Sequence, residues 1–177
     1  MRGSDPDAAV YWLMRMLEAG EDPLFIARRM IIFASEDVGN ADPQALQVAV
    51  AAKDAFHFLG NPEGRIPLAQ AATYLATAPK SNASYRAMLA AGVAVSQHGA
   101  LPVPLALRNA PTPLMKGLGY GADYRYPHDY DDALVAQQCL PDVLAEARFY
   151  EPSDRGAEAE IGTRMHAARA AKRRTPL

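Results

Sequence analysis

Apolar residues recur at helical spacing through the stretch from Ile66 to Tyr85. Its first half begins with Pro67, where a missing N–H costs nothing, and continues with an apolar stripe at i, i+3, i+4 and i+7. The stripe consists of Leu68, Ala71, Ala72 and Leu75. Pro79 ends this helix, and Ser81 is expected to cap the next one by accepting a bond from an N–H near Ser84 or Tyr85. We therefore predict that Lys80, Ser81 and Asn82 form a polar loop between two central core helices.

Three earlier helices share one start signal, an aspartate that can cap followed by a proline in the first turn. The pairs are Asp5-Pro6, Asp22-Pro23 and Asp42-Pro43. Together with the apolar periodicity they predict helices over residues 6–19, 23–38 and 43–59. Gly39 is expected to end the second helix with a left-handed cap. The helix that Ser81 caps should run to about His98.

The second helix has only a thin polar edge. A helix this apolar is either central or faces another subunit, and we take it as the candidate oligomer face. The face consists of Phe25, Ile26, Met30, Ile31 and Phe33. Changing Ile31 to Asp should either break an oligomer or unfold the domain.

The pattern changes at Ala100, where prolines allow only short helices. We expect such pieces over 105–109, 113–117, 133–140 and 141–147, and a final helix from about Ser153. Four of the eight tyrosines lie between residues 117 and 132, which predicts an ordered, irregular arm because disordered segments lack aromatics. The chain is thus predicted to be all-α, with a helical body (1–99), an irregular Pro/Gly/Tyr-rich arm (100–152) and a C-terminal helix with a basic tail (153–177).

Composition narrows the function classes. The 177 residues suffice for one domain with a real core, and a net charge of −2 excludes a general polyelectrolyte binder. The last residues are nevertheless basic and could touch a phosphate backbone, although a solvated helix end is equally consistent. These cations are Arg164, Arg169, Lys172, Arg173 and Arg174. The single cysteine, Cys139, excludes an internal disulfide and a cysteine-based zinc site, and neither a membrane span nor a signal peptide is recognisable. We expect a cytoplasmic protein.

Two segments mimic phosphate-binding loops. Residues 117–121 are rich in glycine but lack the preceding strand and the spacing of either standard motif, so turn glycines explain them better. Lys80-Ser81 resembles the end of a nucleotide-binding loop, but no glycine precedes it in the required window. Lys80 is therefore either a solvated cation at a helix junction or an anion contact.

The arm holds the remaining candidates for binding. His128 with Asp129, Asp131 and Asp132 suggests a metal cluster, but a turn is favoured because no second histidine lies nearby. Aromatic residues interleaved with cations could stack single-stranded bases, while core-anchoring tyrosines are the alternative. These residues are Tyr124, Arg125, Tyr126, His128 and Tyr130. Ser35 and Cys139 are the only tempting nucleophiles and have no predicted base, so no catalytic constellation and no metal site are assigned.

Several stretches together resemble one family. They are SDPDAAVYWLMRMLEAGEDPLFIARRMIIFASEDVGNADPQAL, IPLAQAATYLATAPKSNASY, VPLALRNAPTPLMKGLGYGADYRYPHDY and RFYEPSDRG. In combination they resemble the C-terminal half of the replication-associated recombination protein A (RarA/MgsA) AAA+ ATPases, which are related to the Werner helicase-interacting protein. The likeness runs from about Arg2 to Met165. The chain departs from it at residues 133–135 in the arm and at Ala157 near the last helix.

The resemblance implies a helical body similar to the collar domains of clamp loaders, associated with homotetramer formation. It also implies that the ATPase module, with its ATP and Mg²⁺, is missing from this chain, so no catalytic or cofactor-binding residue transfers to it. The full protein would act at stalled replication forks and DNA ends in the nucleoid, with single-stranded DNA-binding protein as a partner. The competing hypothesis is a DNA- or partner-binding module that uses the YRYPHDY arm and the basic tail. Lys80, Ser81 and Asn82 are further candidate contacts for DNA or a partner.

Overall fold

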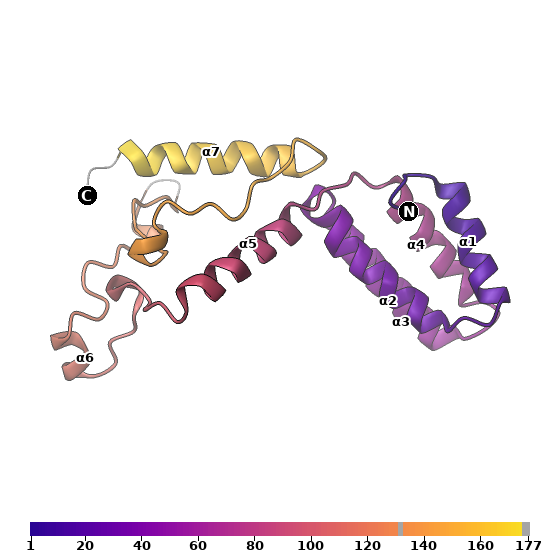
Figure 1. Ribbon diagram of the computed structural model, residues 1–177, viewed down its shortest axis with the longest axis horizontal. Coiled ribbons are helices and arrows are strands. Elements are labelled where there is room, and N and C mark those ends of the chain that lie inside the picture. Colours follow the sequence, from indigo (N-terminus) through magenta and orange to yellow (C-terminus); the bar gives the residue numbers. More distant parts are fainter. Residues whose placement is uncertain (131–132, 175–177) are drawn as a thin grey trace. The chain divides into compact units, whose positions relative to one another are not determined.

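The computed structural model describes residues 1–130 and 133–174, with side chains through residue 170. All regular secondary structure in this part of the chain is helical, which confirms the predicted all-α class (Figure 1). The chain forms two compact units: unit 1 comprises residues 1–89 and 150–162, and unit 2 comprises residues 90–149 and 163–177. No described helix is both long and apolar enough to cross a lipid bilayer.

Four helices build unit 1: α1 (Pro6–Glu18), α2 (Pro23–Phe33), α3 (Gln44–Leu59) and α4 (Arg65–Thr77). Helix α4 packs against both α1 and α3, and α2 packs along α3, as the right half of Figure 1 shows. The predicted stripe of α4 is buried completely, so α4 lies at the centre of the core. Much of this core is alanine, which lets the helices approach closely.

The aspartate start signals work as predicted. Asp5 Oδ1 accepts from the Ala8 N–H at 2.9 Å, and Asp22 Oδ1 accepts from the Leu24 N–H at 2.9 Å. Asp42 Oδ1 accepts from the Gln44 N–H at 3.1 Å, and α3 begins at Gln44 rather than at the predicted Pro43. Each carboxylate thus accepts a hydrogen bond from a backbone N–H that has no acceptor within the helix.

The second helix is shorter than predicted. Helix α2 ends at Phe33, and the chain then widens into the π-helical turn η1 (Ala34–Val38) before the 3₁₀ turn η2 (Gly39–Ala41). Gly39 has a φ of +54°, but its ψ of −138° differs from the left-handed cap we expected. Glycine is favoured here by the positive φ and by the close approach of the Ser81 carbonyl oxygen, which would lie 2.8 Å from a Cβ at this position.

Helix α5 (Ala83–His98) follows the Lys80–Asn82 loop. We predicted a central core helix here, and that prediction is wrong, because Ala83 is its only buried residue. The larger side chains, among them Met88, Leu89 and Val95, are exposed. The sequence predicted a helix here but could not indicate which segments pack against it.

Unit 2 contains short helices joined by irregular chain. They are η3 (Leu105–Leu107), α6 (Pro113–Gly117), η4 (Pro127–Asp129) and η6 (Asp142–Leu144). The prediction over 113–117 is confirmed, the pieces at 105–109 and 141–147 shrink to single 3₁₀ turns, and residues 134–139 form no helix. The long C-terminal helix α7 (Glu158–Arg174) begins several residues after the predicted start, and its first turn belongs to unit 1.

Burial differs sharply between the two units. Every buried residue among those described belongs to unit 1, including Glu158 at the start of α7. The described residues of unit 2 are exposed or at most half-buried, even where they are large and apolar. The described residues of unit 2 are therefore locally structured but form no core of their own.

Candidate functional site

The predicted Lys80-Ser81-Asn82 tip is tied back onto unit 1. Lys80 Nζ donates to the Ala76 carbonyl at 3.0 Å and also to the Ala78 carbonyl, and it lies 5.9 Å from the centre of the Phe33 ring. Burial lowers the pKa of Lys80 despite the nearby Asp37 carboxylate. Lys80 thus binds carbonyls at the end of α4 and is not the solvated cation that its sequence context suggested.

Ser81 is buried and meets a residue that the sequence reasoning did not single out. Its hydroxyl donates to Glu158 Oε2 at 2.5 Å and accepts from the Ala83 N–H at 3.2 Å, so Ser81 does cap α5 but not through the N–H groups near Ser84 that we expected. Asn82, the third residue of the predicted tip, is exposed.

The buried Glu158 is the centre of a polar cluster that reaches the surface. The Tyr150 hydroxyl donates to Glu158 Oε1 at 2.8 Å, and the Ser153 N–H donates to Oε2 at 2.8 Å. Asn40 extends the cluster, since its Nδ2 lies 3.2 Å from both the Tyr150 hydroxyl and Ser84 Oγ. Burial alone would raise the pKa of Glu158, but the hydrogen bonds from Ser81, Ser153 and Tyr150 outweigh it and lower the pKa.

Glycine permits the close contact between the segments that form this cluster. The Ala157 N–H donates to the Ala41 carbonyl at 2.8 Å, and a Cβ at Gly156 would lie 2.1 Å from the same oxygen. Arg155 adds a bond from Nη1 to the Lys80 carbonyl at 3.1 Å. Segments 39–41, 80–84 and 150–158 therefore meet in one clasp, which joins parts of the ASEDVG, ATAPKSN and RFYEPSDRG motifs. Both oxygens of the buried Glu158 accept hydrogen bonds within the chain, which suits a structural junction rather than an acid–base centre.

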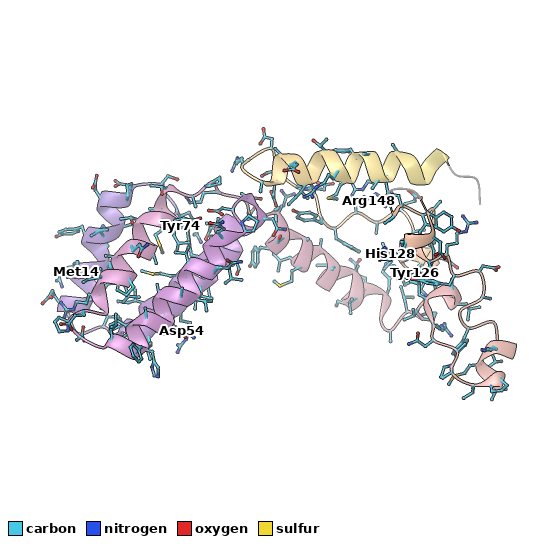
Figure 2. The ribbon with its side chains drawn as sticks, turned by 180° about the vertical axis from the view of Figure 1, so that it is seen from behind. Met14, Asp54, Tyr74, Tyr126, His128 and Arg148 are labelled. Carbon is cyan, nitrogen blue, oxygen red and sulfur yellow. The ribbon has the colours of Figure 1, made fainter. Side chains whose placement is uncertain are left out.

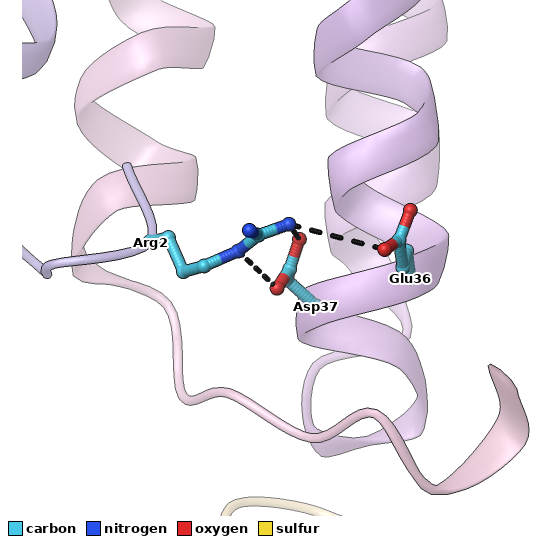
Figure 3. Close-up of polar contacts among 3 residues, drawn as sticks. All are labelled: Arg2, Glu36 and Asp37. Atoms are coloured by element: carbon cyan, nitrogen blue, oxygen red, sulfur yellow. Dashed lines mark hydrogen bonds and ion pairs between the residues drawn. The ribbon is translucent and has the colours of Figure 1, made fainter. Parts of the chain in front are cut away.

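A second polar contact holds the N-terminal residues on the same unit. Arg2 Nε donates to Asp37 Oδ1 at 2.7 Å and its Nη2 to Oδ2 at 2.9 Å, while Glu36 lies 3.8 Å away (Figure 3). The hydrogen bonds and charge of Asp37 raise the pKa of Arg2. Asp42 follows η2 directly in the chain, and its Oδ2 accepts a hydrogen bond from the Tyr74 hydroxyl at 2.6 Å. The turns after α2 are thus fixed by side chains from several segments.

The predicted oligomer face divides between core and surface. Ile26, Met30 and Phe33 lie in the core of unit 1, and Ile31 packs against it. Phe25 remains 42% exposed and lines an apolar cavity of about 310 Å³ between α1 and α2, with Trp12 and Met16 among its other walls. Only the edge of the predicted face is therefore on the surface of this chain.

The arm presents its aromatic side chains outward. Tyr124, Tyr126 and Tyr130 are roughly half-exposed. The Tyr126 ring lies 5.1 Å from the exposed His128 ring. Figure 2 labels these two neighbouring side chains. Arg125 turns inward, because its N–H donates to Gln137 Oε1 at 2.9 Å and its guanidinium reaches the Ala136 carbonyl at 3.4 Å. The three tyrosines are thus accessible to solvent, whereas the intervening cation lies against the backbone of the arm.

Three other predicted features are the glycine-rich segment, the suggested metal cluster and the basic tail. Gly119 and Gly121 lie in turns, as preferred from the sequence, whereas Gly117 is the last residue of α6. The Arg108 guanidinium lies 5.0 Å from the centre of the Tyr120 ring. Asp131 and Asp132 of the suggested metal cluster lie outside the described residues, and no group of three potential metal ligands occurs in the part that is described. Arg164 is exposed on α7, whereas the side chains of Lys172, Arg173 and Arg174 lie outside the described residues.

Comparison with known proteins shows which family this chain is similar to. The family model described as "MgsA AAA+ ATPase C terminal" matches residues 3–169. Replication-associated recombination protein A of Coxiella burnetii is 53% identical over 166 residues, which cover 93% of this chain and 38% of the relative. The Escherichia coli K12 protein of the same name is 52% identical over 93% of this chain and 37% of its own length.

The likeness extends to a eukaryote. ATPase WRNIP1 of Dictyostelium discoideum is 48% identical over 152 residues, which cover 85% of this chain and 17% of that protein. The chain spans little more than a third of the length of the bacterial relatives. The resemblance expected from the sequence motifs is confirmed: this chain belongs to the family of MgsA AAA+ ATPase C-terminal regions.

Proposed function

We propose that this chain is a helical oligomerisation module that joins four copies of a replication- and recombination-associated AAA+ ATPase. In this proposal the module works mechanically. It holds four ATPase modules in a collar, so that ATP-driven motion acts on one DNA end or stalled fork. ATP and Mg²⁺ would bind in the ATPase module and not in this chain, and single-stranded DNA-binding protein would be a partner of the assembled protein.

The lack of a core in unit 2 carries this proposal. Ordering each residue costs roughly 1–2 kcal/mol of backbone entropy, which a domain recovers mainly by burying apolar surface. No described residue of unit 2 is buried, although the unit contains many large apolar side chains. The more exposed of these are Val93, Val95, Val103, Leu105, Leu114, Leu118 and Val143. Neighbouring copies would supply the burial that this unit lacks by itself.

Light scattering across a dilution series tests the proposal. We expect a mass close to four chains that persists on dilution, because an interface that completes a fold should be obligate and apolar. A mass of one chain at every concentration would contradict it.

A second candidate function rests on the exposed tyrosines of the arm. Tyr124, Tyr126 and Tyr130 could stack on the bases of single-stranded DNA, while Arg164 and the basic end of α7 contact phosphates. Fluorescence anisotropy with a labelled single-stranded oligonucleotide tests this function. Binding should weaken with salt and with Tyr126→Ala, while Tyr11→Ala on α1 serves as the exposed-tyrosine control. Binding that changes with neither would argue against this candidate.

A further inference from the structure

Helix α5 carries an apolar stripe that stays exposed in the described part of the chain. The stripe consists of Tyr85, Met88, Leu89, Gly92, Val93 and Val95, and its five large side chains are all more than a third exposed. Tyr85, Met88, Gly92 and Val95 follow one another at intervals of three and four residues, the spacing of a seam along which two helices pair. The opposite side of α5 carries Ala87, Ala91 and Ala94, which are half-buried. The helix therefore turns its larger apolar residues outward.

A small residue lies at the centre of this stripe. A Cβ added at Gly92 would meet no atom within 4 Å, so packing inside the chain gives no reason for glycine here. Glycine inside a helix costs about 1 kcal/mol relative to alanine. At a helix crossing, however, a missing side chain lets two backbones approach closely, because the separation of the axes depends on the residues at the contact.

We propose that the α5 stripe pairs with the α5 stripe of a second copy of this chain, antiparallel and about a two-fold axis that passes close to Gly92. The pairing rests on the proposed oligomerisation and assigns it a surface. Met88 and Leu89 of one copy then pack beside Val93 and Val95 of the other, because a two-fold axis exchanges residues on either side of it.

The composition of the stripe favours a second copy over other partners. None of its six residues is charged, so two stripes meet without repulsion, whereas a nucleic acid would need cations. Two stripes would together bury an area on the order of 1,000 Å², which is about the minimum for a biological interface. This fits one of two interface types in a tetramer, in which each chain contacts more than one neighbour.

Met88→Asp and Ala90→Asp form a matched pair for the test, made in the full 177-residue chain. Ala90 is exposed and lies two positions from Met88, which is about 160° around the helix. Both variants add one carboxylate to α5, but only Met88→Asp puts it into the stripe. We expect Met88→Asp to reduce the mass measured by light scattering at least two-fold, and Ala90→Asp to leave it unchanged.

Cross-linking provides an independent readout that does not depend on weakening the assembly. Cys139 is exposed and is first changed to Ser. Gly92→Cys then places one thiol from each copy close to the two-fold axis, within the Cα separation of about 4–7 Å that a disulfide needs. Mild oxidation should convert the Gly92→Cys chain to a covalent dimer and leave an Ala90→Cys chain largely uncross-linked.

The outcomes separate this inference from the proposed function. If the wild-type chain is tetrameric but Met88→Asp keeps the tetramer and Gly92→Cys does not cross-link, the α5 pairing is wrong and oligomerisation uses another surface. A wild-type chain with the mass of a monomer would overturn both. Should Met88→Asp lose its helical circular dichroism, the cross-linking result decides.

Discussion

The two units of this chain contain similar apolar residues and use them differently. In unit 1 these residues recur at helical spacing on helices of 11 to 16 residues, so each helix gathers them on one face that packs against its neighbours. In unit 2 prolines limit most helices to three to five residues, too short to collect such a face. Apolar content alone is therefore not enough to build a core. The helices must also be long enough to gather their apolar residues on one face.

The largest expected effect compares one leucine from each unit. Leu75 is fully buried in α4, so Leu75→Ala should cost about 3–5 kcal/mol of unfolding free energy. Leu114 is 72% exposed in α6, and Leu114→Ala should cost less than about 0.5 kcal/mol as long as no partner covers it. Urea denaturation followed by circular dichroism measures both. Equal costs would show that unit 2 buries Leu114 in solution, most simply in an oligomer.

The next effect concerns the clasp that holds residues 150–158 in unit 1. Glu158→Ala leaves the Ser81 hydroxyl, the Tyr150 hydroxyl and the Ser153 N–H without their acceptor, which should cost about 3 kcal/mol. Glu160→Ala, two residues along the same helix at an exposed position, is the matched control and should change little. A small loss for Glu158→Ala, measured by the same denaturation, would mean that the clasp does not contribute to the stability of unit 1.

The same carboxylate should make unit 1 sensitive to acid. Because folding lowers the pKa of Glu158 from its ordinary value of 4.5, its contribution is fully present above that value and is lost as the pH falls through the folded pKa. At pH values below about 4.5, the midpoint temperature of thermal unfolding should therefore decrease more steeply in the wild type than in Glu158→Gln, whose side chain cannot titrate. Parallel pH profiles would place the acid sensitivity in other carboxylates.

The smallest expected effect is at the Arg2–Asp37 contact of unit 1. The guanidinium is exposed to water, which screens the pair, so Arg2→Ala should leave the midpoint of thermal unfolding nearly unchanged. High salt should have no further effect on that variant. A clear loss of stability would mean that the contact fixes η1 more strongly than its exposure indicates.

Local chemistry made part of this fold predictable. The Asp-Pro pairs mark three helix starts within one residue because a cap depends only on the adjacent backbone. The π-helical turn after Phe33 and the late start of α7 at Glu158 were missed, since both adapt to contacts with distant segments. Glu158 itself was missed for the same reason, because its partner Ser81 lies 77 residues away in the sequence.

The amino-acid sequence alone was enough to predict the helical class, the three helix starts at Asp-Pro pairs, the family and the change of character near Ala100. Only the tertiary structure decided that α2 enters the core while most of α5 stays uncovered, and that Lys80 and Ser81 face inward. The physical reason is that periodicity defines an apolar face from residues a few positions apart, whereas burial of that face depends on which distant segments pack against it.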